Sequence, residues 1–234
     1  MLEQAFDALK TYDYGVDRHV LDPIDEAVIK TRNDPAARNE LESRLLAVLQ
    51  SHVTRDAKDY VCRQLRTMGT TASVPVLEGL LGDAELSHMA RYALERIPEP
   101  QAGQALERQL GKLNGDLKVG VISSLGTRGQ MAAGKSVPLL RPLLKDPDDA
   151  VARAAAVALG RIGSVEANKA LASVKPRAAL VAVFADASMC CAERLIAAGH
   201  AREAKATYGR LLKGQPSELV RLAAERGLKT CERG

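Results

Sequence analysis

Leucines recur along this chain at a nearly constant interval, each inside a stretch with helical periodicity. Leu65, Leu94, Leu125 and Leu159 lie 29, 31 and 34 residues apart, and Leu228 follows 69 residues later, about two intervals. A helical hairpin of this length cannot bury its apolar stripe alone, so neighbouring hairpins must stack against one another. The spacing predicts an all-α fold, a right-handed α-solenoid (superhelix) of stacked antiparallel helix pairs.

Apolar residues follow the spacing of one helix face in several segments, and no segment alternates as a strand would. The clearest stripe consists of Leu86, Met89, Ala90, Ala93, Leu94 and Ile97. Residues 57–68 and 151–162 carry similar stripes. Glycine and proline fall between the stripes, as at Gly69, Pro100 and Gly163, where helices are expected to begin or end.

Two segments carry a family resemblance. Residues 62–69, which end in Leu65-Arg66-Thr67-Met68-Gly69, and residues 155–163, which end in Leu159-Gly160-Arg161-Ile162-Gly163, resemble HEAT repeats. Residues 86–95 and 119–126 are similar to the bacterial short-repeat branch, which is often labelled phycobilisome-lyase-like. The resemblance covers residues 36–175. It implies the solenoid fold and says little about function.

The two ends depart from this pattern. Residues 1–35 are predicted to be N-terminal capping helices, with Leu21, Ile24 and Val28 on one face. Residues 36–175 are the predicted HEAT-like repeats. Residues 176–234 are predicted to continue the same solenoid, with a hairpin at 190–213 that resembles a tetratricopeptide repeat. A last helix from Pro216 to about Thr230 would cap the array.

Charge is distributed unevenly between the two halves. The chain has a net charge of +4, but residues 1–117 carry −5 and residues 118–234 carry +9. Aromatic residues make up only 3% of the sequence, and there is no tryptophan. A basic C-terminal half favours an acidic partner, whereas the scarcity of aromatic rings disfavours stacking on nucleic-acid bases.

One segment matches a nucleotide-binding motif. Residues 129–136, Gly-Gln-Met-Ala-Ala-Gly-Lys-Ser, fit the phosphate-binding pattern GxxxxGK[ST], and residues 180–186 could serve as an apolar strand that ends in a metal-binding aspartate. That chemistry requires a strand before the loop and a helix after it. Because the flanking residues keep the register of the helical repeat, we interpret Thr127–Ser136 as a lengthened interhelix loop.

No set of residues has the spacing of a metal or catalytic site. The candidates are Cys62, Cys190, Cys191, Cys231, His19, His52, His88 and His200. None forms a zinc-ligand pattern, and no nucleophile motif is present. We therefore expect packing cysteines, no metal, no cofactor and no enzyme activity. The segment after Met1 has no apolar core and the longest apolar run, 178–185, is short, so we expect a cytoplasmic protein that does not span a membrane.

Polar residues that avoid the apolar stripes of the second helices should share the concave surface of such a solenoid. The predicted partner-binding residues are Arg63, His88, Arg91, Glu95, Lys118, Arg128, Arg153 and Arg161, with Arg66, Arg221 and Arg226 on the same surface. Arginine binds carboxylates and phosphates through its planar fork. The leading prediction is a scaffold or adaptor that binds a protein. The alternatives are nucleic-acid binding through the basic half, as in the HEAT-like DNA glycosylases, or a lyase or chaperone role implied by the family label.

Overall fold

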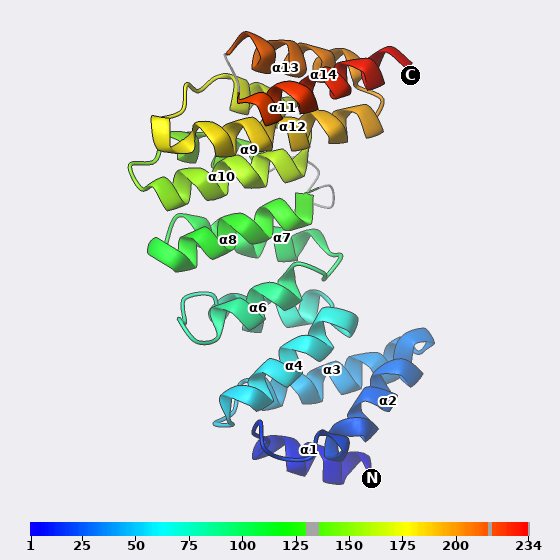
Figure 1. Cartoon of the computed structure of the whole chain (residues 1–234). Coiled ribbons are helices and arrows are strands. Elements are labelled where there is room, and N and C mark those ends of the chain that lie inside the picture. The colour runs from blue at the N-terminus through cyan, green and yellow to red at the C-terminus, as the bar shows by residue number, and fades with distance from the viewer. Residues whose placement is uncertain (130–135, 215–216, 234) are drawn as a thin grey trace. The chain divides into compact units, whose positions relative to one another are not determined.

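Every regular element in the part of the chain that the structure describes is a helix (Figure 1). The computed structural model describes residues 1–129, 136–214 and 217–233. The chain divides into two compact units, residues 1–113 and 114–234. The segment boundaries predicted near residues 35 and 175 lie within these units and do not coincide with the division between them. The all-α prediction is confirmed.

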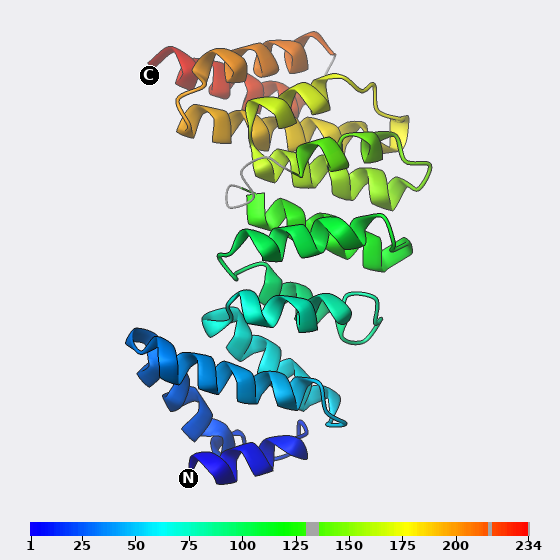
Figure 2. The ribbon, with the colours of Figure 1, turned by 180° about the vertical axis from the view of Figure 1, so that it is seen from behind.

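Unit 1 is built from short helices packed in pairs. Its elements are α1 (Leu2–Lys10), η1 (Arg18–Leu21), α2 (Asp22–Lys30), η2 (Thr31–Asn33), α3 (Pro35–Leu49), α4 (Arg55–Met68), η3 (Thr71–Ser73), α5 (Val74–Gly79), α6 (Ser87–Leu94) and α7 (Pro100–Leu110). Helices α4 and α6 pack side by side, while α3 packs on α4 and α5 packs on α6 and α7. Seen from behind, α3 lies in front of α4 (Figure 2).

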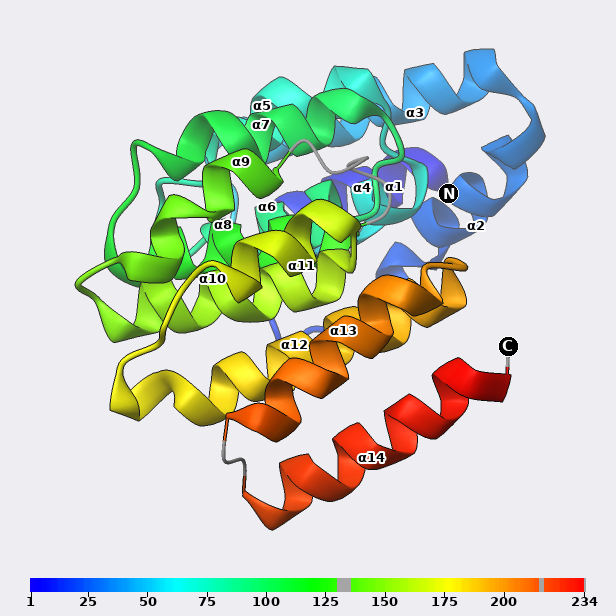
Figure 3. The same ribbon diagram turned by 90° about the horizontal axis from the view of Figure 1, so that it is seen from above.

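Unit 2 repeats this arrangement of paired helices. Its elements are α8 (Gly115–Arg128), α9 (Val137–Leu140), η5 (Pro142–Lys145), α10 (Asp149–Ile162), α11 (Val165–Ala172), η6 (Ala178–Leu180), α12 (Val181–Ala197), α13 (Ala201–Lys213) and α14 (Glu218–Arg233). Helices α8, α10, α12 and α14 follow one another in one layer, and α9, α11 and α13 form the second. Helices α13 and α14 run side by side at the C-terminal end (Figures 1 and 3).

The recurring leucines lie in the core of each unit. Leu65 and Leu94 in unit 1 are 0% exposed, as are Leu125 and Leu159 in unit 2. Leu228 in α14 is only partly buried, which suits a helix at the end of a stack. The leucine interval therefore marks the residues that join stacked helices, and the predicted solenoid of helix pairs is confirmed.

Local sequence signals fix where the helices begin and end. The Thr54 hydroxyl accepts a hydrogen bond from the Ala57 N–H (3.1 Å) at the start of α4, and Asp148 caps α10 through the Ala150 N–H (2.8 Å). These bonds satisfy N–H groups that have no partner within the helix. Helix α10 ends at Gly163, whose φ of +63° is the left-handed conformation that glycine adopts without strain.

Two glycines in unit 2 allow neighbouring helices to approach closely. A Cβ at Gly126 would lie 2.6 Å from the Ala158 Cα, and a Cβ at Gly160 would lie 2.7 Å from the Ala187 backbone oxygen. Any side chain at these positions would therefore collide with the backbone of the next helix in the layer. The dipeptides Leu125-Gly126 and Leu159-Gly160 thus set both the buried contact and the separation of the helices.

A buried carboxylate holds the turn after α4 in unit 1. Glu42 in α3 is 2% exposed and accepts hydrogen bonds from the Thr70 N–H (2.7 Å), the Thr70 hydroxyl (2.9 Å) and the Ser73 hydroxyl. Hydrogen bonds of this kind offset the cost of burying a charge. Glu42 therefore fixes the α4–α5 connection on α3.

Candidate functional site

The outward face of α4 and α6 in unit 1 gathers two arginines around one tyrosine. The Arg66 guanidinium carbon lies 4.4 Å from the centroid of the Tyr92 ring, and that of Arg63 lies 5.8 Å from it. Arg63 also donates a hydrogen bond from Nε to Asp59 (2.8 Å), which raises the pKa of Arg63. Arg66 makes no hydrogen bond or ion pair within the described residues, and its Nε is buried without a partner.

Three other predicted contact residues lie along or at the end of α6. His88 is exposed in its first turn, whereas Arg91 and Glu95 are half-buried. Burial lowers the pKa of Arg91, and the neighbouring Glu95 carboxylate opposes that effect. Of the three, His88 is the residue most open to solvent.

The outward face of α10 in unit 2 carries two exposed arginines. Arg153 and Arg161 are separated by eight residues, and Val157 between them is also exposed. Neither arginine has an ion pair or hydrogen bond within residues 1–129, 136–214 and 217–233. At about 1.5 Å of helix rise per residue, the two side chains leave α10 at points about 12 Å apart. They are the predicted residues in unit 2 that are best placed to contact a second molecule.

Two predicted contact residues occupy structural positions instead. Arg128, in the last turn of α8, is 1% exposed, so its side chain is not available to a partner. Lys118 is 20% exposed and its ammonium group lies 3.6 Å from the Asp146 carboxylate, an ion pair that links α8 to the turn before α10. Neither Arg128 nor Lys118 therefore belongs to the candidate surface.

Helix α14 carries the last two arginines of the predicted surface. Arg221 is exposed and pairs with Glu225 one turn later (2.8 Å). Arg226 is exposed as well. A pair of this kind on a helix surface contributes little to stability.

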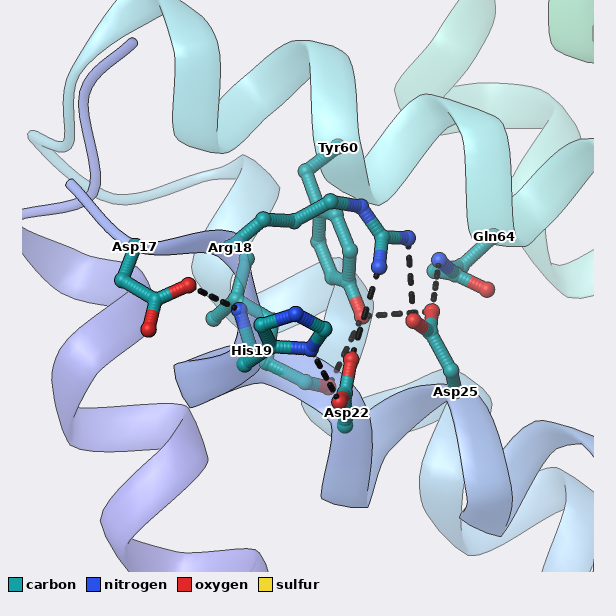
Figure 4. Close-up of polar contacts among 8 residues, drawn as sticks. Asp17, Arg18, His19, Asp22, Asp25, Tyr60 and Gln64 are labelled. Atoms are coloured by element: carbon teal, nitrogen blue, oxygen red, sulfur yellow. Dashed lines mark hydrogen bonds and ion pairs between the residues drawn. The ribbon is translucent and has the colours of Figure 1, made fainter. Parts of the chain in front are cut away.

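Sequence reasoning did not find the polar network shown in Figure 4, which joins α2 to α4 in unit 1. Asp25 is its centre: its Oδ1 accepts hydrogen bonds from the Tyr60 hydroxyl (2.9 Å) and the Gln64 amide (2.8 Å). Its Oδ2 lies 2.9 Å from a terminal nitrogen of Arg18. Burial and the Asp25 charge raise the pKa of Tyr60 far above its usual value, so the phenol stays protonated. The network therefore binds α2 to α4 through Asp25 and a protonated Tyr60.

One edge of this network reaches solvent. The His19 ring lies 2.8 Å from the Asp22 carboxylate, and this contact raises the pKa of His19 (Figure 4). Both residues belong to the junction between η1 and α2. The pair therefore keeps the His19 ring charged to a higher pH than an unpaired histidine would be.

The cysteines behave as packing residues where they are buried. Burial raises the pKa of Cys62 and of Cys191 to about 12 in each case, so both thiols are protonated and unreactive. Among the described residues no group of three or more histidine, cysteine or acidic side chains is arranged to hold a metal ion. None of the described helices is long and apolar enough to cross a membrane.

The motif that resembles a phosphate-binding loop falls mostly on residues 130–135, which lie outside the described residues. The segment before it is helix α8, where a nucleotide-binding loop requires a strand. Residues 180–186, the possible second strand, belong to η6 and α12.

One part of the chain matches a known family of helical repeats. Residues 109–181 match the family model for HEAT repeats. Among solved structures, the chain is similar to human deoxyhypusine hydroxylase in complex with glycerol, with 15% identity and a TM-score of 0.36, over 100% of this chain and 96% of that one. A likeness at this level carries no implication for activity. No curated protein gives a significant match. The segment that matches the HEAT-repeat model therefore lies within an all-α solenoid.

Proposed function

We propose that this protein is a non-catalytic scaffold or adaptor, and that it binds a partner protein through the exposed face of the α8, α10 and α12 layer. The observation that carries the proposal is the pair Arg153 and Arg161. Both guanidinium groups are exposed on α10 and neither pairs within the described residues. Arginine is enriched at protein interfaces because its planar fork binds carboxylates bidentately.

The charge of unit 2 favours an acidic partner. Residues 114–234 contain 19 lysines and arginines against 11 acidic residues, a net charge of +8. Complementary charge accelerates association and selects between partners. The resemblance of residues 86–95 and 119–126 to the bacterial short-repeat branch supports an adaptor role as well, since such repeats also occur as modules within larger proteins.

Nucleic acid is the competing ligand for a basic surface. Proteins that bind single strands stack bases on exposed aromatic rings. Phe184 and Tyr208 are the aromatic residues of unit 2, and both are buried. A protein partner therefore fits this face better than a single-stranded nucleic acid.

The test replaces Arg153 and Arg161 by glutamate and compares capture of partners from a lysate of the source cells by quantitative mass spectrometry. The matched control replaces Lys169 and Lys175, which are exposed and unpaired, by glutamate. Both double variants change the net charge equally. We expect the first variant to lose specific partners and the control to keep them, with unchanged melting temperatures in both.

Equal capture by the two variants would contradict the proposal, as would a loss of capture that follows a fall in melting temperature. A separate titration with generic duplex DNA covers the competing ligand. Binding that weakens steeply with salt and disappears in the Arg153→Glu, Arg161→Glu variant would favour a nucleic-acid function instead.

A further inference from the structure

Arg66 on α4 is a cation without a hydrogen-bonding partner on the outward face of unit 1. Its guanidinium carbon lies 4.4 Å from the centroid of the Tyr92 ring on α6. No ion pair or hydrogen bond to Arg66 occurs within the described residues, and its Nε is buried and unsatisfied. Most arginines of comparable burial have their N–H groups occupied, because a buried donor without an acceptor is costly.

Stacking on a ring holds a guanidinium without using its donors. The attraction between Arg66 and Tyr92 acts through the faces of the two groups, whereas the five N–H donors of arginine point outward in its plane. The ring therefore fixes the orientation of the fork and leaves the N–H groups of its two terminal nitrogens, which unlike Nε are not buried, for a planar acceptor. Preorganisation of this kind lowers the entropy lost on binding.

A second guanidinium strengthens the positive potential beside the same ring. Arg63 lies 5.8 Å from the Tyr92 centroid, and its Nε is engaged by Asp59 at 2.8 Å. This ion pair anchors the Arg63 side chain near Arg66, so two cationic groups face one ring.

We propose that Arg66, oriented by Tyr92 and supported by Arg63, binds a single carboxylate, that of a glutamate or aspartate in a protein segment. This site is separate from the α10 face proposed above and goes beyond it, because it lies in unit 1 and uses other residues. The two proposals can therefore fail independently.

The charge of unit 1 distinguishes an isolated carboxylate from a polyanion. Residues 1–113 contain 14 lysines and arginines against 18 acidic residues, a net charge of −4. Asp59 itself lies within the cluster. A unit of this charge repels nucleic acid or a run of acidic residues, whereas one carboxylate can form short, charge-assisted hydrogen bonds with one guanidinium.

The experiment observes the arginine Nε–Hε resonances of the full-length protein by NMR. The probe is the blocked tripeptide N-acetyl-Gly-Glu-Gly-amide, with the Gln analogue and inorganic phosphate as comparison probes. We expect the Glu peptide to shift the Arg66 resonance with weak, millimolar affinity and the Gln peptide to leave it unchanged. The exposed and unpaired Arg96 in the same unit serves as an internal reference that should not shift.

Four variants separate a binding role from a structural one. Arg66→Lys keeps the charge but removes the fork, and should raise the Kd about tenfold, measured in this variant from the Nε–Hε resonance of the neighbouring Arg63. Tyr92→Phe keeps the ring and should bind as the wild type does, whereas Tyr92→Leu removes the ring and should weaken binding. Arg96→Lys is the control and should change nothing. Melting temperatures of all four variants show whether each remains folded.

The proposal is overturned if the Glu peptide shifts no Arg66 signal in the wild-type protein, a result that needs no variant to fold. It is equally overturned if Arg66→Lys binds as well as the wild type, if Gln and Glu peptides act alike, or if phosphate alone perturbs Arg66. Loss of the α10 interaction with retention of this one would refute only the proposed function.

Discussion

The same substitution, glycine to alanine, should have opposite effects at two positions in unit 2. Gly160 lies within α10, and a Cβ there would be 2.7 Å from the Ala187 backbone oxygen and 3.0 Å from its Cα. Gly209 lies within α13, and a Cβ there would have no atom within 4 Å. The pair therefore separates the effect of packing from that of helix propensity.

The magnitudes follow from two opposing effects. Alanine favours a helix over glycine by about 1 kcal/mol, so Gly209→Ala should stabilise the protein by about that amount. At Gly160 the contact is about 0.7 Å shorter than the 3.4 Å at which ordinary contacts begin, and the opposing atoms are backbone. Overpacking of this kind costs about 1–3 kcal/mol. Because backbone atoms cannot move aside as a flexible side chain can, the cost at Gly160 should lie in the upper part of that range, about 2–3 kcal/mol, and the net expectation for Gly160→Ala is a loss of about 1–2 kcal/mol.

Urea unfolding followed by circular dichroism measures both variants against the wild type, and thermal melting gives a second readout. A protein of this size should melt about 2–8 °C lower with Gly160→Ala and a few degrees higher with Gly209→Ala. Repeat proteins can unfold in more than one step, so the unfolding midpoints are compared for each resolved transition. A Gly160→Ala variant as stable as the wild type would refute the close approach of α10 and α12.

Three further predictions concern buried and titrating groups. Glu42→Ala removes the acceptor of three hydrogen bonds from Thr70 and Ser73, and should cost about 3 kcal/mol in the free energy of unfolding, measured by urea denaturation; a loss below about 1 kcal/mol would contradict it. The His19 pKa, raised by Asp22, should lie above the usual value for histidine in an NMR titration and fall in Asp22→Asn. Because the pKa of His19 is raised in the folded protein, the His19–Asp22 contact stabilises the fold at a pH below the usual histidine pKa, and this stabilisation disappears as the pH rises through the folded-state pKa. An unchanged His19 pKa in Asp22→Asn would exclude Asp22 as the cause. Cys62 and Cys191, each with a pKa raised to about 12, should resist iodoacetamide in the native protein while Cys190 and Cys231 react first, as peptide mass spectrometry can measure.

The fold could be predicted from the sequence because it depends on a pattern that repeats. The stripe on residues 57–68 became α4, with Ala57, Tyr60, Val61 and Leu65 buried as predicted. Glycines and prolines between the apolar stripes mark helix ends because either residue inside a helix costs free energy relative to alanine. The α12–α13 hairpin has the helices expected at 190–213, and α14 begins within two residues of the predicted Pro216.

The candidate site was harder to predict because helical periodicity identifies a face and not a partner. Arg128 is the clearest error, yet the repeat contained the signal. It lies three residues after its leucine, where the other repeats have Met68, Ile97 and Ile162, and all three are buried. The repeat alignment therefore predicts a core position that arginine occupies here. Lys118 carries no comparable signal, because its ion pair depends on the path of a turn.

Contacts between repeats can also be read from the same alignment. Arg63 and Tyr92 are 29 residues apart, the interval between Leu65 and Leu94, so they occupy equivalent positions in consecutive repeats. Equivalent positions on stacked helices are neighbours. The proximity of Arg63 to Tyr92 is therefore predictable, whereas the closer contact of Arg66 with that ring depends on side-chain conformations that no period determines.

The residue that follows each core leucine differs between the two units: it is charged in unit 1 and glycine in unit 2. In unit 2 it is Gly126 or Gly160, and the backbone of the next helix occupies the space that a side chain would need. In unit 1 the same position holds Arg66 after Leu65 and Glu95 after Leu94, and the long Arg66 side chain extends from α4 onto the Tyr92 ring of α6. One position in the repeat therefore serves two purposes: without a side chain it brings helices together, and with an arginine it directs a cation to the surface, where the ring of the following helix orients it.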